Sequence, residues 1–164
     1  MTAQRHSYDF GHKPKCLVIV DDSAECDRAV YYASRWAKRS GGGVVMLRVI
    51  DMDNRNQEWL GVADIMRAEA EEAANAALDI AFGRANGLAA ITPERVIREG
   101  DPTAQILDVI DKDADIAILV LAASIGVEGP GPLITTLAKT AGTFPIPVVL
   151  VPGNLSDIDI DALS

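Results

Sequence analysis

Histidine is scarce in this sequence, and its placement restricts the chemistry that the chain can perform. The two histidines are His6 and His12, so the chain has none after its first twelve residues. A Ser-His-Asp triad and most zinc sites depend on histidine. We therefore predict no catalytic residue and no metal site in the folded part of the chain.

Cysteine and aromatic residues are also few. Cys16 and Cys26 are ten positions apart, which is neither a C-x-x-C motif nor the spacing of zinc ligands. We predict that both are buried free thiols without a redox role. Aromatic residues make up 5% of the chain, so it lacks a large surface for stacking nucleic-acid bases.

Basic residues are outnumbered by acidic ones. There are 24 acidic and 15 basic residues, which gives a formal net charge of −9. Such a charge repels nucleic acid and anionic membranes, so we expect neither as a partner. No apolar run approaches the ~18 residues that a membrane span requires. Residues 1–15 lack the apolar core of a signal peptide, so a cytoplasmic protein is expected.

What the sequence does contain is a regular alternation of apolar runs and helix-like segments. Apolar runs typical of strands buried on both faces occur at residues 16–20, 116–121 and 146–151. Two further strands are expected at residues 44–50, which Arg48 interrupts, and at residues 96–99. Their alternation with helices predicts an α/β fold with one doubly wound, five-stranded parallel sheet and helices on both faces. This domain is expected over residues 15–152, between a flexible arm (1–14) and an acidic tail (153–164).

Individual residues predict the ends and the buried faces of the helices. Ser23 is expected to cap the first helix, Gly87 to end the second, and Asp101 with Pro102 to start the third. The expected buried residues are Cys26, Val30, Ala33 and Ala37 in the first helix, Val62, Met66, Ala70, Ala73, Ala77 and Ile80 in the second, Ile106, Leu107 and Ile110 in the third, and Leu133, Leu137 and Ala141 in the fourth.

The glycine-rich loop at residues 123–132 is the expected centre of function. It follows the buried strand 116–121 and precedes a helix, and ligands of open parallel sheets bind beyond the carboxyl ends of the strands. Two interpretations stay open: a tight strand-to-helix turn, or a site for a nucleotide or another anion. Asp21, at the end of the first strand, is likewise either a turn carboxylate or a ligand contact.

Several short segments, taken in their order and spacing, resemble the universal stress protein family from about Lys15 to Pro152. The segments are Val18-Ile19-Val20-Asp21-Asp22-Ser23, Leu47-Arg48-Val49-Ile50-Asp51, Glu99-Gly100-Asp101-Pro102, Asp115-Ile116-Ala117-Ile118-Leu119-Val120 and Pro147-Val148-Val149-Leu150-Val151-Pro152. The resemblance implies strand order 3-2-1-4-5, a crevice between strands 1 and 4, and a homodimer. Many members of this family bind ATP in that crevice, which would place adenine beside Asp21 and Val49.

The family's phosphate loop, written G-x2-G-x9-G-[S/T], is only partly present. Counted back from the last strand, its first glycine position holds Ala123 and its second holds Gly126. The final pair is Ile134-Thr135, after a gap of seven residues instead of nine. The side chain of Ile134 is expected to obstruct the path of a triphosphate.

Three further residues are expected to weaken phosphate binding. Pro130 and Pro132 each remove a backbone donor, and Glu128 adds negative charge. We expect no cofactor, or weakly bound ATP or AMP. The candidate site comprises Asp21, Ser23, Val49, Ala123, Ser124, Gly126, Gly129, Gly131, Thr135 and Thr136.

Three functions are compatible with these residues. The first is a non-enzymatic stress-response protein with a degenerate nucleotide pocket, acting through its dimer or a protein partner. The second is an adenine-nucleotide-binding protein with at most slow ATP hydrolysis. The third is a phosphorylated receiver domain, suggested by Asp21-Asp22, although a receiver needs an aspartate where this chain has Glu99.

The last apolar run predicts self-association. Residues 146–151 carry no charge, and the implied strand order places them at an edge of the sheet, which must be covered. A two-fold pairing of strands is the simplest cover, with Ile158 and Ile160 of the tail lying across the partner. The expected dimer contacts are Ile146, Val148, Val149, Leu150 and Val151.

Overall fold

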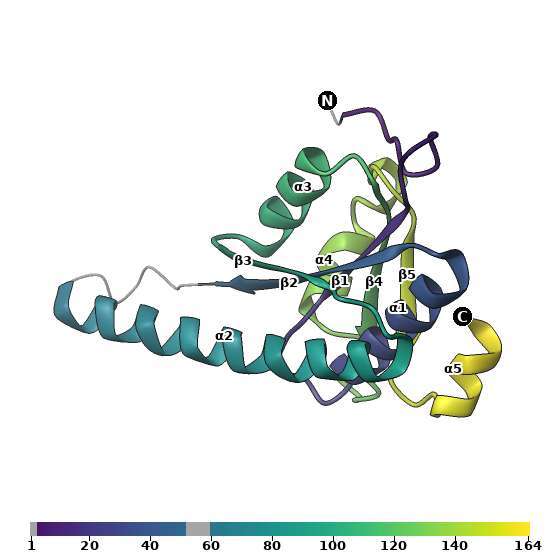
Figure 1. The fold of residues 1–164 in the computed structure, drawn as a ribbon. Coiled ribbons are helices and arrows are strands. Elements are labelled where there is room, and N and C mark those ends of the chain that lie inside the picture. The colour runs from purple at the N-terminus through teal and green to yellow at the C-terminus, as the bar shows by residue number, and fades with distance from the viewer. Residues whose placement is uncertain (1–2, 52–59) are drawn as a thin grey trace.

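A computed structural model describes residues 3–51 and 60–164 of the chain. The five strands are β1 (Lys15–Ile19), β2 (Gly43–Ile50), β3 (Glu94–Glu99), β4 (Ile116–Ala123) and β5 (Val148–Pro152), and they form one sheet (Figure 1). The helices are α1 (Cys26–Ser40), α2 (Leu60–Ala89), α3 (Pro102–Lys112), α4 (Pro132–Ala138) and α5 (Asp157–Leu163), together with the short 3-10 helix η2 (Ala141–Thr143).

The topology confirms the predicted fold class. All four strand pairs are parallel, and their spatial order is β3-β2-β1-β4-β5. The order therefore reverses between β1 and β4, where open α/β sheets bind their ligands. Receiver domains have the order 2-1-3-4-5 instead, so the topology contradicts the receiver hypothesis.

Helices cover both faces of the sheet because successive side chains of a strand point to opposite faces. Val18 and Val20 of β1 belong to a core formed with α1, α2 and α5. Leu17 and Ile19 belong to a second core, formed with α3 and α4. This double burial explains why β1 has no polar alternation.

The start of α1 differs from the expectation. Glu25 occupies the N-cap position, and its side chain makes no capping hydrogen bond. The Ser23 hydroxyl donates to Asp21 Oδ1 instead, so it stabilises the preceding turn and does not cap the helix. The end of α1 is formed by Gly41, whose left-handed φ of 70° terminates the helix.

The buried face of α2 also differs from the expectation. Val62, Met66 and Ile80 are 48%, 38% and 77% exposed. The helix continues to Ala89, so Gly87 lies inside it. Ala73 is exposed too, and Ala70 and Ala77 are half-buried. The residues of α2 that are buried are Ala74, Leu78, Ala81 and Ala85.

The position of α2 explains this difference. Its first half projects past the carboxyl edge of the sheet (Figure 1), and its first buried residue among those described is Ala74. Both stripes follow helical spacing, so the apolar period of an alanine-rich segment does not select between them. None of the helices in the described ranges, α2 included, has the length and apolar character of a membrane span.

The start of α3 confirms the prediction. The backbone N of Ala104 donates to the Asp101 carboxylate at 2.9 Å, and Pro102 is the first helical residue. Ile106 and Ile110 are fully buried as predicted. Leu107 is 38% exposed, and Val109 is buried in its place.

The face of α4 is rotated from the predicted one. The helix begins at Pro132 and ends at Ala138. It buries Ile134 together with the predicted Leu137, whereas Leu133 is half-buried. Ala141 lies beyond the helix, in η2, and is exposed.

The N-terminal segment packs against the body along the α3–β4 connection. The Arg5 guanidinium donates to Asp113 O at 2.9 Å, and Ser7 is buried. His12 Nδ1 lies 2.6 Å from the Asp115 carboxylate. These contacts differ from the flexible arm expected for residues 1–14.

The C-terminal segment contains α5, which packs on α1 of the same chain. Ser156 caps it by a capping box with Asp159. Ile160 is fully buried in the core between α1 and the sheet, so it does not lie across a partner as expected. Ile158, in contrast, is 80% exposed. Residues 153–164 are therefore part of the packed domain.

Candidate functional site

Three adjacent cavities lie along the carboxyl edge of the sheet. The α2 cavity, of about 500 Å³, lies between the β1–α1 loop and α2. The crevice cavity, of about 150 Å³, lies between the ends of β1 and β4. The loop cavity, of about 710 Å³, lies beside the β4–α4 loop. Asp21 and Ser23 line the first two, and Glu25 and Gly131 line the last two, so the cavities form one row.

Asp21 is positioned by a tight turn at the end of β1. Its Oδ1 accepts hydrogen bonds from the Ser23 backbone N, at 2.9 Å, and from the Ser23 hydroxyl. This Asx turn gives Asp21 a structural role, and its role as a ligand contact stays a prediction. The same geometry leaves Asp21 exposed between the α2 cavity and the crevice cavity.

The neighbouring Asp22 pairs with Arg48 of β2. Arg48 Nη1 and Nη2 donate to the two carboxylate oxygens at 3.1 and 2.7 Å. These hydrogen bonds hold the pKa of Asp22 below its usual range. The arginine side chain is 14% exposed, so the pair fixes the end of β1 to β2. The polar interruption of an apolar strand by Arg48 is the sequence signal for this contact.

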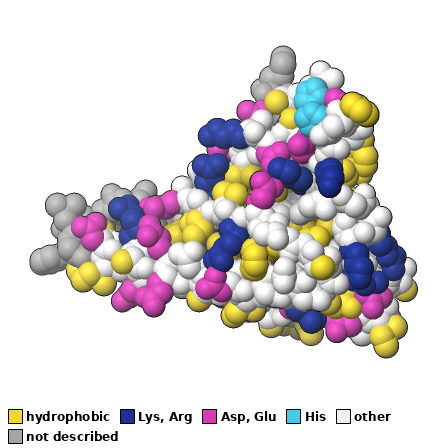
Figure 2. Space-filling model, viewed as in Figure 1, with side chains coloured by type: hydrophobic (Ala, Val, Ile, Leu, Met, Phe, Trp, Pro, Cys, Tyr) yellow, Lys and Arg dark blue, Asp and Glu magenta, His cyan; other side chains and the backbone are white. Residues whose placement is uncertain are grey.

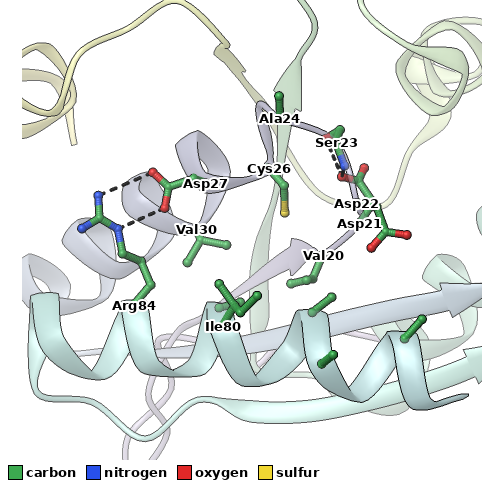
Figure 3. A pocket seen from close by; sticks show the side chains of 14 residues that line it. Val20, Asp21, Asp22, Ser23, Ala24, Cys26, Asp27, Val30, Ile80 and Arg84 are labelled. Carbon is green, nitrogen blue, oxygen red and sulfur yellow. Dashed lines mark hydrogen bonds and ion pairs between the residues drawn. The ribbon is translucent and has the colours of Figure 1, made fainter.

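The α2 cavity has mainly apolar walls. Figure 3 shows Val20, Val30 and Ile80 pointing into the space between α1 and α2. Alanines of α2 complete this wall, and their small side chains leave the space open: Ala73, Ala76, Ala77 and Ala81.

An ion pair closes one end of the α2 cavity (Figure 3). Arg84 Nε lies 3.0 Å from Asp27 Oδ1, and this contact joins α2 to α1. Burial acts to raise the pKa of Asp27, but hydrogen bonds from Arg28 and Arg84 hold it below its usual range. Asp27 is therefore a structural carboxylate.

The β4–α4 loop satisfies many of its own backbone donors. Ser124 N donates to Pro130 O at 3.0 Å, and Gly129 N donates to Gly126 O at 3.2 Å. Gly126 N donates to Ser124 Oγ at 3.1 Å. Phosphate loops bind their ligand through free amides, and three amides are already occupied here. Gly129 and Gly131 have left-handed φ values of 105° and 118°, which explains both glycines.

The start of α4 offers fewer phosphate contacts than its sequence suggested. The hydroxyls of Thr135 and Thr136 donate to Gly131 O and Pro132 O, both at 2.9 Å. Ile134 packs in the α3–α4 core at 7% exposure. The helical turn directs Ile134 towards the sheet, where it lines the crevice cavity and not the loop cavity, so its expected obstruction of a triphosphate stays a prediction.

Acidic residues border the loop cavity. Glu25 and Glu128 line it and are exposed, and no base is among its described lining residues. In the described linings of the three cavities, Arg84 is the only base, and it already pairs with Asp27. A polyphosphate would therefore meet negative charge without an available counter-ion.

Most of the predicted site residues line these cavities. Asp21 and Ser23 border the α2 and crevice cavities, and the loop cavity is lined by Ser124, Gly126, Gly129, Gly131, Thr135 and Thr136. Val49 and Ala123 line none of the three described cavities, because both pack against the α3–α4 core. The predicted residues therefore form two groups, joined through the crevice cavity.

Sequence reasoning missed two residues at this edge. Gly153 N donates to Ala123 O at 2.9 Å, and a Cβ at Gly153 would lie 2.6 Å from that oxygen. Only glycine lets the end of β5 approach β4 so closely. Glu25 lines two cavities, but nothing in the sequence distinguishes it from a solvated helix-start acid.

The cysteines are free thiols, as predicted. Cys16 is fully buried, and burial raises the pKa of its thiol. Cys26 is half-buried, and burial raises its pKa to about 11. Neither is a thiolate at neutral pH.

The family assignment rests on this fold and on a match to a known family. The profile of the universal stress protein family matches residues 14–152, which include all five strands. The chain belongs to the universal stress protein family. This match confirms the resemblance seen in the sequence. A comparison with curated proteins found no match.

Solved universal stress proteins share the fold. UspA from Lactobacillus plantarum has a TM-score of 0.72 and 20% identity, over 84% of this chain and 97% of that one. A universal stress protein from Archaeoglobus fulgidus, solved in complex with dAMP, has a TM-score of 0.59 and 18% identity, over 84% of this chain and 97% of that one. A further universal stress protein, solved in complex with cAMP, has a TM-score of 0.60 and 19% identity, over 86% of this chain and 98% of that one. At 18–20% identity, this likeness shows that the universal stress protein described here shares their fold, and it shows nothing about its ligand.

Proposed function

We propose that this universal stress protein is a non-enzymatic stress-response regulator that binds adenosine or its monophosphate and discriminates against ATP. The observation that carries the proposal is the closed β4–α4 loop. The amides of Ser124, Gly126 and Gly129 bond within the loop. Each added phosphate would have to break these bonds or remain without donors, which costs free energy.

The base side supports binding of the nucleoside. Asp21 is an exposed acceptor beside the crevice cavity, and its turn fixes its position before a ligand arrives. A carboxylate accepts hydrogen bonds from an exocyclic amine such as that of adenine. The adenosine part would lie at Asp21, and a single phosphate would point towards the loop cavity.

Two relatives support a ligand with one phosphate. They were solved in complex with dAMP and with cAMP. Both ligands carry adenine and one phosphate group, which is the chemistry that this crevice accommodates with the least conflict. ATP binding with slow hydrolysis is the competing function.

Calorimetric titration of AMP tests the base contact. Asp21→Ala is expected to weaken AMP binding about tenfold, because it removes a charge-assisted hydrogen bond. Asp64→Ala is the matched control, because Asp64 is an exposed aspartate on α2 outside the described cavity linings. An equal response of both variants would contradict the proposed site. ATP turnover above the protein-free blank would contradict the non-enzymatic role.

We also propose a homodimer formed through β5. The strand lies at the edge of the sheet, and Leu150 is 49% exposed on it. An uncovered apolar edge strand favours pairing with a second copy. Light scattering at micromolar concentration tests this. Leu150→Lys is expected to shift the mass towards that of one chain with an unchanged circular dichroism spectrum, because the Leu150 side chain is exposed. A monomeric wild-type protein would contradict the dimer.

A further inference from the structure

A row of exposed apolar side chains runs along α2. Val62, Met66, Ala73 and Ile80 follow helical spacing on a face that does not contact the sheet. We call these four residues the α2 stripe. From Val62 to Ile80 it spans five helical turns, or about 27 Å. Exposed apolar rows of this extent mark interaction surfaces.

The stripe continues into the α2 cavity. Ala73 and Ile80 are part of the wall of that cavity, opposite Val20 and Val30. Figure 3 shows Ile80 directed into the same space as Val30. The stripe and the cavity thus form one open groove. The cavity has room for side chains of a ligand, and α2 forms the long floor of the groove. A helix placed in such a groove contacts it through residues three and four positions apart.

The borders of the groove are acidic. On α2, Glu69 lies on the same face as the stripe, between Met66 and Ala73, and Glu72 is exposed beside it. On the opposite side of the groove, Asp21 and Asp22 follow β1. Figure 2 shows acidic side chains along the projecting part of α2 with apolar ones between them. Over its whole length α2 has five acidic residues and two basic ones.

This charge selects among possible occupants. A second copy of the chain would bring two acidic α2 helices together, which like-charge repulsion opposes. An anionic lipid surface is repelled for the same reason. A basic helix with one apolar face matches both the apolar floor and the acidic borders.

We propose that the α2 stripe and the α2 cavity form a docking groove for a basic amphipathic helix of a partner protein. This groove is separate from the β5 edge, and it shares Asp21 with the proposed adenine contact. It gives the regulator a surface through which it acts on another protein. Partner binding would rest on apolar contacts at Ile80 and Met66 and on long-range attraction by the acidic borders.

A labelled model peptide tests the groove. The probe is a helix of about 18 residues of leucine and lysine with leucine at helical spacing, which matches the length of the stripe. Its control has the same composition with the leucines distributed around the helix. Fluorescence anisotropy without nucleotide is expected to show binding of the first peptide only, weakened by added salt.

Two matched substitutions locate the binding. Ile80 and Ile158 are isoleucines on helices with similar exposure, 77% and 80%. Ile80→Asp is expected to weaken peptide binding at least about tenfold, and Ile158→Asp less than about twofold. Both variants keep the core intact, which circular dichroism checks. Equal effects of the two, binding of the control peptide, or loss of a dimer in Ile80→Asp would overturn the proposal.

Discussion

The two sides of the crevice are built in different ways. On the side of β1 and β2, side chains define the surface: Asp21 is held by a turn, and Asp22 is bound to Arg48 at 2.7 Å. On the side of β4, the backbone defines it, and the loop closes through Ser124 N to Pro130 O at 3.0 Å. The first side presents an acceptor, whereas the second has used many of its donors.

This difference teaches how a shared fold changes its ligand. The ends of parallel strands are fixed by the sheet, so Asp21 keeps its place regardless of the loop. A phosphate site requires several free amides in a glycine-rich loop, and a few hydrogen bonds within the loop remove it. We therefore expect recognition of a base to persist where recognition of phosphate is lost.

The largest expected effect is on the free energy of unfolding, and it comes from a substitution at Gly153, which contacts the end of β4. In Gly153→Ala, the new Cβ meets Ala123 O at 2.6 Å and Glu25 Cβ at 3.1 Å. We expect a loss of about 1–3 kcal/mol in the free energy of unfolding, measured by urea denaturation. Gly142→Ala is the control, because a Cβ there meets nothing within 4 Å. Equal stability of the two variants would contradict the close packing at Gly153.

A smaller effect is expected on the strand side. Arg48→Met removes the pair with Asp22, and we expect a loss of about 0.5–1 kcal/mol at neutral pH, because Asp22 is 71% exposed and screened by solvent. Arg48 Nε is buried without a hydrogen-bond partner, so removing it limits the loss.

The pH dependence of this variant has a definite sign. The folded-state pKa of Asp22 is lowered, so its contribution is present above the unfolded pKa of about 3.9 and is lost as pH falls through the folded pKa. The stability difference between wild type and Arg48→Met should therefore be constant near neutral pH and shrink in strong acid. A difference that grows on acidification would contradict the assignment.

The smallest expected effect sharpens the contrast between base and phosphate. Glu128→Gln removes one exposed charge at the loop cavity and should strengthen ATP binding about threefold through reduced repulsion, with adenosine unaffected. Glu94→Gln is the control, because Glu94 begins β3 at the opposite edge of the sheet. Parallel titrations of the two ligands measure the effect. Tighter adenosine binding in Glu128→Gln would argue against a charge effect on phosphate.

The sequence predicts the sheet well because a strand that is buried on both faces appears in the sequence as an uninterrupted apolar run. Runs such as Ile116 to Leu121 admit little other than a central strand, and Asp101-Pro102 specifies a helix start by hydrogen bonding and ring geometry. The acceptor at Asp21 was also predictable, since it ends such a strand.

The remainder depends on contacts that the sequence does not encode locally. The rotation of α2 follows from where the helix meets the sheet, so Ala74 is buried and Ile80 is exposed despite equal periodicity. The burial of Ile134 follows from the direction in which α4 leaves the loop. The closed loop depends on hydrogen bonds between residues whose types would equally suit an open phosphate loop.

One titration series tests the central claim most directly. Calorimetry with adenosine, AMP and ATP on the same protein measures how affinity changes with the number of phosphates. The account predicts measurable binding of adenosine and AMP, and ATP binding at least about tenfold weaker than AMP binding, since each phosphate lacks charge-assisted donors. ATP binding equal to or tighter than AMP binding, or no binding of any of the three, would contradict it.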